Sequence, residues 1–517
     1  MPTTDEQIRA YYDAAPYGSY AYRQCAPEHI SAIAKLFGIA APGVATARVL
    51  ELGCSSGGNL LPFAIREPGA TVLGLDLSGS HIERGQRAIA RMGLANAQLR
   101  QANIAELDVA ALGEFDYIIC HGLYSWVPPQ VQEAMLDICR RALSPDGIIY
   151  VSYNTYPGWK SREIIRDAML LHSRDKDTVA ERLAHARAMV GFLKKVAPRQ
   201  SVLSNVVDEN MRILSRTGDD YLAHDYLEPD NRPCYFEQFV ARAGAHGLGY
   251  LAEAEPSRML PGNFGPDVAA ALSQSFADDP IKGQQYLDFA INRTFRQSLL
   301  VSAERATSAS RSIGRDALLS LHFAASLPCL GGATRLDGSE QVYGPADASG
   351  VSSSHDAVKL AVGALTRAWP GTRSRDELLS EVSQVLANRP AAARDTAEAA
   401  VDELLDYLAR RGLLRLRDRA LRLATGESDT PRLEAGARLQ LGALEPGEAV
   451  IANPWHDSVD ITPTERAWLP LLDGAHARVS LIAALAALPA PLAPPAGGEA
   501  VALDALLTAA RNKGLLS

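Results

Sequence analysis

ARVLELGCSSGGN, residues 47–59, joins an apolar run to a turn of small residues, and a second apolar run, LLPFAIREP, follows it. The first run has the composition of a buried strand that ends near Glu51, and the second has that of a helix. Between them, Gly53, Ser55 and Gly57 let a ligand approach the backbone closely. Because open α/β sheets bind ligands at the carboxyl ends of their strands, this stretch predicts a first parallel strand followed by a binding turn.

An acidic residue closes the next expected strand, TVLGLDLS. This residue, Asp76, follows Gly57 by 19 residues. An acid about 20 residues past a glycine turn binds ribose hydroxyls in dinucleotide folds, so the pair predicts an adenosine-containing cofactor. The NAD fingerprint has glycine where this chain has Ser55, which favours S-adenosylmethionine over a dinucleotide.

Further candidate cofactor residues come from the ends of the first and third strands. The helix after the turn offers free N–H groups to the carboxylate of S-adenosylmethionine, and Glu51 is a candidate partner for its ammonium. Asn59 either contacts the cofactor or caps that helix. Asn103 and Ile104, in QANIAEL, are expected at the adenine, although a loop asparagine is also a common turn residue. The complete set of expected cofactor-binding residues is Glu51, Gly53, Cys54, Ser55, Gly57, Asn59, Asp76, Leu77, Asn103, Ile104 and His121.

Two loops rich in aromatic residues follow the fourth and fifth strands, HGLYSWVPP at 121–129 and YNTYPGW at 153–159. Both are expected at the same edge of the sheet as the glycine turn. Aromatic faces can hold a sulfonium or a methylammonium by cation–π attraction, but a proline-rich structural corner would also use them. We predict catalytic positions at Tyr124, Trp126, Tyr153 and Asn154, with His121, Tyr156 and Trp159 nearby.

Strands alternate with helices through the first 160 residues, a pattern typical of βαβ units and a parallel sheet. A charged, helical stretch at about 161–230 interrupts this pattern. It resumes with a helix and strand in YFEQFVARAGAHGLGYLAEAEP and a last strand in TFRQSLLVSAER, at about 294–305. We therefore predict an α/β, Rossmann-like domain from 1–160 and 231–305, with 161–230 as a helical insertion.

The insertion carries one apolar stripe at helical spacing, formed by Val179, Leu183, Ala186, Val190 and Leu193. Two interpretations stay open: the stripe packs within its own domain, or it joins two subunits. After the last strand, helices and a strand-like tail predict a winged-helix-like middle domain at 306–428. A smaller α-rich domain is expected at 429–517.

The composition describes an ordinary globular protein with a formal net charge of −9 and no basic run, which disfavours nucleic acid as a partner. The six cysteines show no spacing typical of a metal site or disulfide framework, so we expect no metal and a reducing compartment. No apolar stretch reaches the length of a membrane span, and the N-terminus lacks the pattern of a signal peptide. We therefore predict a cytoplasmic protein without a membrane span.

ELGCSSGGN, LGLDLS, FDYIICHGLYSWVPP and YVSYNTYPGW resemble bacterial class I S-adenosylmethionine-dependent methyltransferases that carry a methyltransferase regulatory domain. YLAHDYLEPDNRPCYFEQFVARAGAHGL resembles the regulatory part, and the similarity is close over about residues 10–300. The best-understood members are rickettsial protein-lysine methyltransferases, dimers that modify an outer-membrane surface protein. The resemblance implies a seven-stranded class I sheet, a protein-lysine substrate such as a surface protein, and a homodimer.

The resemblance also implies roles for single residues. It puts Glu51, Gly53 and Asp76 on the cofactor, Asn103 and Ile104 at adenine, and His121, Tyr124, Trp126 and Tyr153 at the methyl and the amine. Cys25 and Ala26 depart from the family pattern near the N-terminal segment, which the family pattern would place over the cofactor. The rival functions are a small-molecule methyltransferase and a non-catalytic S-adenosylmethionine-binding scaffold with a partner-binding C-terminal region. A nucleic-acid methyltransferase is disfavoured because the fourth strand ends in CHGLYS instead of an Asn-Pro-Pro-Tyr-type motif.

Overall fold

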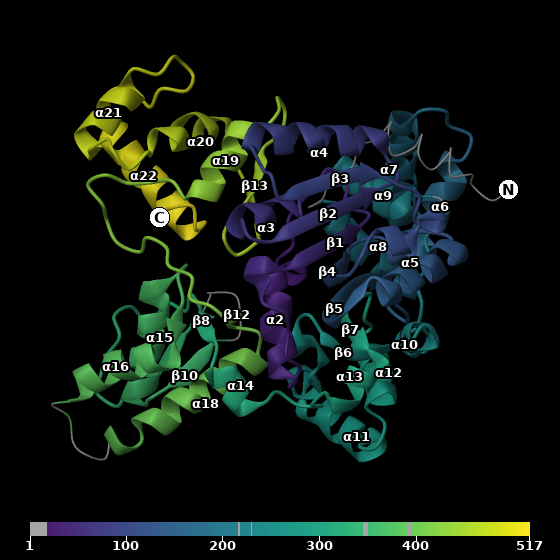
Figure 1. The fold of residues 1–517 in the computed structure, drawn as a ribbon, viewed down its shortest axis with the longest axis horizontal. Coiled ribbons are helices and arrows are strands. Elements are labelled where there is room, and N and C mark those ends of the chain that lie inside the picture. Colours follow the sequence, from purple (N-terminus) through teal and green to yellow (C-terminus); the bar gives the residue numbers. More distant parts are fainter. Residues whose placement is uncertain (1–17, 216–217, 229, 345–349, 388, 390–393) are drawn as a thin grey trace.

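The computed structural model describes residues 18–215, 218–228, 230–344, 350–387, 389 and 394–517 (Figure 1). Its largest element is a seven-stranded sheet with the strand order β3-β2-β1-β4-β5-β7-β6. The strands are β1 (Arg48–Leu52), β2 (Thr71–Asp76), β3 (Ala97–Gln101), β4 (Phe115–Cys120), β5 (Leu143–Asn154), β6 (Leu248–Glu253) and β7 (Phe295–Ser302). The Rossmann-like, seven-stranded prediction is confirmed.

The directions of the strands indicate where a ligand crevice lies. Strands β1 to β5 pair in parallel, and β7 runs antiparallel to both of its neighbours, β5 and β6. The chain order reverses between β1 and β4, which lie side by side in the sheet. Open α/β sheets bind ligands at such a switch point, outside the carboxyl ends of the strands. The turns after β1 and β4 meet there.

Helices bury both faces of this sheet. Side chains alternate along a strand, so Val49 belongs to one core and the neighbouring Leu50 to the other. The first core also takes side chains from α2 (Pro27–Leu36), α3 (Leu61–Arg66), α4 (Gly79–Met92) and α13 (Ala303–Ser308). The second core takes side chains from α5 (Pro129–Arg141) and α10 (Phe236–Ala245). Helices α11 (Pro266–Phe276) and α12 (Pro280–Ala290) lie between β6 and β7 in the chain.

The stretch after β5 folds into a helical unit with its own core, at the right of Figure 1. Its helices are α6 (Trp159–Ser173), α7 (Val179–Val196), α8 (Val202–Leu214) and α9 (Asp219–Tyr226). Ala186 and Val190 of the apolar stripe are buried in this core, and Leu183 and Leu193 pack against it. These four of the five stripe residues pack within the insertion, which agrees with the first of the two interpretations.

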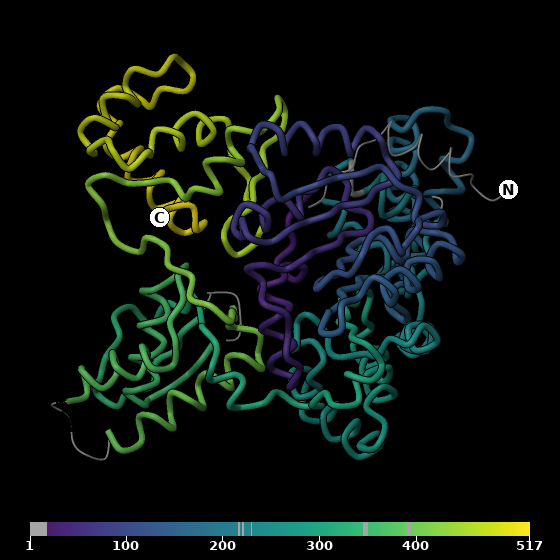
Figure 2. The backbone as a smooth tube through the Cα atoms, in the orientation of Figure 1, coloured from purple at the N-terminus to yellow at the C-terminus, as the bar shows by residue number. Residues whose placement is uncertain are grey.

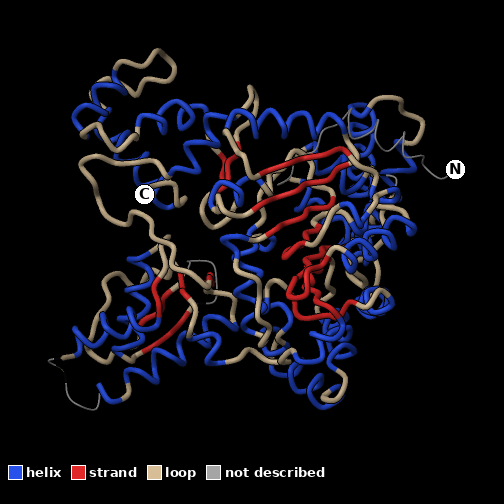
Figure 3. The backbone as a smooth tube through the Cα atoms, viewed as in Figure 1, coloured by secondary structure: helices blue, strands red, loops and turns tan. Residues whose placement is uncertain are grey.

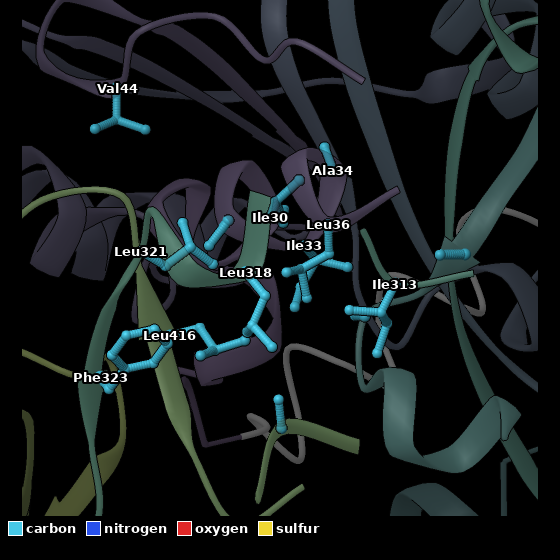
Figure 4. Packing of buried hydrophobic residues seen from close by; sticks show 14 of the residues in the cluster. Ile30, Ile33, Ala34, Leu36, Val44, Ile313, Leu318, Leu321, Phe323 and Leu416 are labelled. Carbon is cyan, nitrogen blue, oxygen red and sulfur yellow. The ribbon is translucent and has the colours of Figure 1, made fainter. Parts of the chain in front are cut away.

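The chain beyond the sheet forms a middle unit of helices and short strands, seen at the lower left of Figure 3. Its elements are α14 (Arg315–Leu319), β8 (His322–Ala324), β9 (Gln341–Tyr343), β10 (Val351–Ser353), α15 (Asp356–Ala368), β11 (Arg373–Ser374), α16 (Arg375–Leu386), α18 (Ala397–Arg410) and β12 (Arg415–Arg417). Strands β11, β8 and β12 make an antiparallel sheet. Helix α2 packs on this unit: Figure 4 shows Ile30 and Ile33 near Leu318, Leu321 and Leu416. One continuous core thus joins the middle unit to the large sheet.

The last segment has a separate core and rests on α3 and α4. Its elements are α19 (Ala435–Ala443), β13 (Val450–Ala452), β14 (Ser458–Asp460), α20 (Pro463–Trp468), α21 (Arg478–Ala486) and α22 (Glu499–Asn512). Arg84 and Arg87 on α4 form ion pairs with Glu448 and Glu445. Figure 2 shows this yellow-green part of the backbone running beside the purple strands. The C-terminal segment therefore docks against the same domain that holds the ligand crevice.

In the described parts of the chain, no helix has both the length and the apolar character needed to cross a bilayer. Across the same residues, no group of three or more His, Cys, Asp or Glu side chains is arranged to hold a metal ion.

Candidate active site

A cavity of about 680 Å³ lies at the carboxyl ends of β1, β2, β4 and β5. Its volume falls in the range of roughly 300–1,000 Å³ that small-molecule sites have. Two groups of residues line it. The cofactor end comprises Glu51, Gly53, Cys54, Ser55, Asn59, Asp76, Leu77, Asn103, Ile104 and His121. The acceptor end comprises Trp126, Asn154, Trp159, Arg162, His224, Asp225, Phe295 and Gln297.

The turn after β1 and the end of β2 are tied together by Asp76. Its Oδ2 accepts a hydrogen bond of 2.8 Å from the Ser55 backbone N–H, and its Oδ1 accepts one of 2.9 Å from the Ser78 N–H. Ser55 has φ 49°, and Gly53 has φ 75°, a conformation that glycine adopts without a steric cost. The bend and the carboxylate therefore line the same crevice, as the two sequence signals require.

Glu51 is buried at the end of β1, with 3% of its surface exposed. Its Oε1 accepts a 2.9 Å hydrogen bond from Asn59 Nδ2, whereas Oε2 has no partner among the described residues. Burial raises the pKa of Glu51 to about 8, because a lone carboxylate is costly in a poorly solvated site. The Ser55 hydroxyl is likewise buried without a partner in the described structure. These unsatisfied polar atoms fit a ligand that brings its own cation and polar groups.

The segment just before α2 covers the glycine turn. The Ser19 hydroxyl accepts a 2.7 Å hydrogen bond from the Gly58 N–H, and a Cβ at Gly58 would lie 2.4 Å from the Ser19 backbone. Glycine is therefore required at position 58 for this close approach. Gly18, Ser19, Tyr20 and Tyr22 all line the cavity. The part of the N-terminal segment that precedes Gly18, residues 1–17, lies outside the described residues.

His121 forms the wall between the two ends of the cavity. The Tyr22 ring lies over it, with ring centroids 3.9 Å apart. Its Nδ1 lies 3.0 Å from the Tyr150 hydroxyl, which accepts a hydrogen bond from Gln297 Nε2. Burial lowers the pKa of His121 to about 4, so the ring is neutral at physiological pH. A neutral ring can sit beside a sulfonium without adding a second positive charge.

Two tryptophans shape the acceptor end. The Trp126 and Trp159 rings meet edge to face, with centroids 6.2 Å apart and an angle of 81° between the planes. The guanidinium of Arg162 lies 4.9 Å from the Trp159 ring centroid. Trp159 Nε1 is buried and has no hydrogen-bond partner among the described residues. Asn154 donates from Nδ2 to Asn231 Oδ1 at 3.1 Å. This end therefore combines aromatic rings with polar and charged side chains, Arg162 and Asp225 among them.

Residues 49–147 match a family described as methyltransferase domain, and residues 218–302 match the predicted methyltransferase regulatory domain family. Residues 429–493 match the C-terminal winged helix domain of PKMT. An uncharacterized protein of Rickettsia prowazekii (RP028) is 36% identical over 233 residues, which make up 45% of this chain and 93% of that relative. The chain belongs to the family of S-adenosylmethionine-dependent methyltransferases with this regulatory domain.

Two further relatives extend the similarity. The solved structure of PKMT2 from Rickettsia typhi in complex with AdoHcy is 26% identical, has a TM-score of 0.85, and covers 97% of this chain and 100% of that chain. A second uncharacterized protein of Rickettsia prowazekii (RP789) is 41% identical over 290 residues, 56% of this chain. The match covers 52% of that relative, so the chain spans about half of its length. The fold of this methyltransferase is therefore shared with PKMT2 along nearly the whole chain.

The structure brings most of the expected cofactor residues of the methyltransferase to the cavity, but not Gly57. Gly57 has φ 84°, and a Cβ there would meet Leu61 and Leu99 at 3.0 Å. Its place is therefore in the packing beneath the turn. Asn103 lines the cavity and also accepts a hydrogen bond from the Ala105 N–H, so it is a turn residue whose contact with the cofactor stays a prediction.

Two of the expected catalytic residues, Tyr124 and Tyr153, do not line the cavity. Both are fully buried in the core beneath α5 and α10, and the Tyr153 ring stacks on Phe239 with centroids 4.0 Å apart. Side chains alternate along β5, so Asn154 reaches the cavity and Tyr153 points to the other face. The Tyr124 hydroxyl accepts a hydrogen bond from Arg242 on α10. These contacts assign both tyrosines to the core, and we do not propose them as catalytic.

Tyr156 was expected near the catalytic positions, but its hydroxyl donates to Glu163 and it does not line the cavity.

Several residues that line the cavity were absent from the sequence-based set. The additional lining residues include Tyr20, Tyr22, Arg162, His224, Asp225, Phe295 and Gln297. His224 and Asp225 lie inside YLAHDYLEPD, a stretch whose resemblance to the regulatory part was the available signal.

Proposed function

We propose that this methyltransferase transfers methyl groups from S-adenosylmethionine to lysine side chains of a protein. The observation that carries the proposal is the lining of one continuous cavity, in which the expected cofactor residues lie at one end and Trp126 and Trp159 at the other. The likeness to PKMT2, a protein solved with AdoHcy, supports both the methyl donor and the lysine acceptor of this proposal. A surface protein is the first substrate class to test, since family members modify one.

At the cofactor end, Asp76 would hold the ribose hydroxyls, and Asn103 and Ile104 the adenine. Glu51 Oε2, which is buried and has no partner among the described residues, would receive the ammonium of the methionine part. A cation at this place would lower the pKa of Glu51 from its raised value and keep the carboxylate charged. The cofactor supplies a methyl group on a positively charged sulfur.

At the acceptor end, the lysine must lose a proton before it can attack, because its ordinary pKa is about 10.4. Trp126 and Trp159 exclude water, which disfavours the ammonium and lowers the pKa of the lysine. Arg162 and Asp225 both line the same space: the like charge of Arg162 lowers the pKa of the lysine further, and the opposite charge of Asp225 acts against it. The Asn154 amide is placed to orient the amine. Catalysis then consists mostly of positioning and water exclusion.

The test is transfer of a labelled methyl group from S-adenosylmethionine into a fractionated bacterial lysate. We expect the label in protein, and amino-acid analysis should recover methyl-lysine. Label in a metabolite would replace this function by a small-molecule methyltransferase. Cofactor binding without any transfer would favour the non-catalytic scaffold.

We further propose that the protein acts in the cytoplasm. We also propose that its chain divides into a sheet domain at 1–160 and 231–305, a helical insertion at 161–230, a middle domain at 306–428 and a C-terminal domain at 429–517. All six cysteines are free thiols, which agrees with a reducing compartment. The insertion has its own core, and the C-terminal segment another, which supports these boundaries.

We also propose a homodimer formed through the helical insertion. Phe192 and Val196, one turn apart on α7, are 54% and 52% exposed, and Leu171 on α6 is 62% exposed. Large apolar side chains gathered on one unit mark an interaction surface. Phe192→Asp should convert the dimer to a monomer in light scattering. Glu209→Ala on α8 serves as a control that leaves these apolar residues in place, and a mutant that stays dimeric would place the interface elsewhere.

A further inference from the structure

One histidine of the C-terminal winged-helix domain lies at the edge of the cofactor site. His456 lies in the turn between β13 and β14 and is 1% exposed. Its φ is 62°, a left-handed conformation that is uncommon for residues other than glycine. The Asn453 side chain fixes this turn by accepting hydrogen bonds from the Trp455 and Asp457 N–H groups. The turn is thus built to present His456 to the other domain.

A chain of hydrogen bonds leads from His456 to the cofactor-binding carboxylate. Arg66 Nη2 lies 2.9 Å from His456 Nδ1, and a guanidinium can only donate, so Nδ1 is the acceptor. Burial, aided by Arg66, lowers the pKa of His456 to about 3, so the ring is neutral and its proton sits on Nε2. That N–H donates to Asn59 Oδ1 at 2.9 Å. The Asn59 amide is thereby turned so that Nδ2 donates to Glu51 Oε1.

The same hairpin also holds the segment that covers the cavity. The Ser458 hydroxyl lies 3.0 Å from both the N–H and the carbonyl oxygen of Ala21. The next N–H, that of Tyr22, donates to Asn59 Oδ1 at 3.2 Å. Asn59 Oδ1 therefore receives one hydrogen bond from each domain, and both fix the same amide orientation.

We infer that the C-terminal domain completes the cofactor site, with His456 as a positioning residue that orients Glu51 through Asn59. The inference rests on the proposed role of Glu51 at the cofactor ammonium. It gives the C-terminal domain a role in cofactor affinity, separate from any contact with the methyl acceptor. Glu51 lines the cavity with Oε1 held by these contacts, and its buried Oε2 is left without a partner among the described residues.

His456→Ala should weaken binding of S-adenosylmethionine about tenfold by calorimetry. Loss of the imidazole frees the Asn59 amide to rotate, and Glu51 then loses its fixed orientation. His456→Gln should remain within about threefold of wild type, because its amide offers a donor and an acceptor side by side. The KM for S-adenosylmethionine should rise with His456→Ala, while kcat at saturating cofactor stays unchanged. Equal losses in both variants would show that only packing matters and would overturn the inference.

Two further variants separate the possible failures. Asn59→Ala combined with His456→Ala should be no weaker than Asn59→Ala alone, because both changes break one chain; additive losses would contradict it. Arg87→Ala removes an interdomain ion pair with Glu445 that does not reach Asn59, so it should leave affinity unchanged. If Arg87→Ala weakens binding as much as His456→Ala, general docking of the domain explains the effect and the inference fails. Glu51→Gln without any loss of affinity would instead refute the proposed role of Glu51.

Discussion

Replacing Asp76 with alanine should weaken binding of S-adenosylmethionine by about 100-fold, which corresponds to about 2.7 kcal/mol. The variant removes the expected partner of the ribose hydroxyls, and hydrogen bonds to charged groups contribute about 1.5–3 kcal/mol. It also removes the acceptor of the Ser55 N–H, so the turn after β1 loses its link to β2. Isothermal calorimetry with S-adenosylmethionine measures the change directly.

The matched control for this variant is Asp116→Ala on β4. Asp116 also accepts a backbone N–H at 2.8 Å, that of Arg48, and a second hydrogen bond from the Ser144 hydroxyl. It lies at the other end of the strands, away from the cavity, so its loss should leave cofactor affinity within about twofold of wild type. Unchanged affinity in Asp76→Ala, or the same loss in both variants, would remove Asp76 from the ribose site.

The sheet could be predicted because each of its signals is local. Gly53, Ser55 and Asp76 occur at strand ends, where a short stretch of sequence sets both the conformation and the chemistry. The helix over Gly79–Met92 also follows local signals, because the Ser78 side chain caps its start and Gly93 ends it. The start of β5 departs from its local signals: the strand begins at Leu143, although Pro145 and Gly147 are residue types typical of a turn.

The aromatic residues show where a sequence pattern fails. Loops or strand ends contain Tyr124, Trp126, Tyr153 and Asn154 alike, and no local pattern separates those that face the cavity from those that do not. Strand alternation and the position of α10 determine which side chains face the cavity. Helix α10 follows β5 in the chain only after the whole helical insertion, so its position is not a local feature. Two tyrosines therefore belong to the core and two neighbours to the cavity wall.

The contribution of the C-terminal domain could not be predicted from any local pattern. His456 meets Asn59 across 397 positions in the sequence, and Ser458 meets Ala21 across 437. Such contacts depend on how the last domain docks on α3 and α4, which no motif in either segment encodes. Asn59 was predicted at the cofactor from its place after the glycine turn, but its partners were not.

Trp126→Ala should reduce kcat/KM for the protein substrate by about 100-fold while the Kd for S-adenosylmethionine stays within about threefold. A small displacement of a reacting group can cost about this factor, since catalysis here depends on alignment. The variant opens the acceptor end and removes the edge-to-face contact with Trp159, so water enters and the lysine keeps its proton. Methylation rates measured at saturating cofactor, with the Kd from calorimetry, separate the two effects.

Tyr153→Phe is the matched aromatic control for Trp126→Ala. It removes a hydroxyl that lies 3.1 Å from Ser298 on the core side of β5, so it should change stability and leave methyl transfer nearly unchanged. Trp126→Phe should recover part of the lost rate, because a smaller aromatic ring still excludes water. Wild-type turnover in Trp126→Ala would make this tryptophan part of the scaffold. A rate loss in Tyr153→Phe equal to that in Trp126→Ala would mean that core packing, and not the acceptor wall, controls transfer.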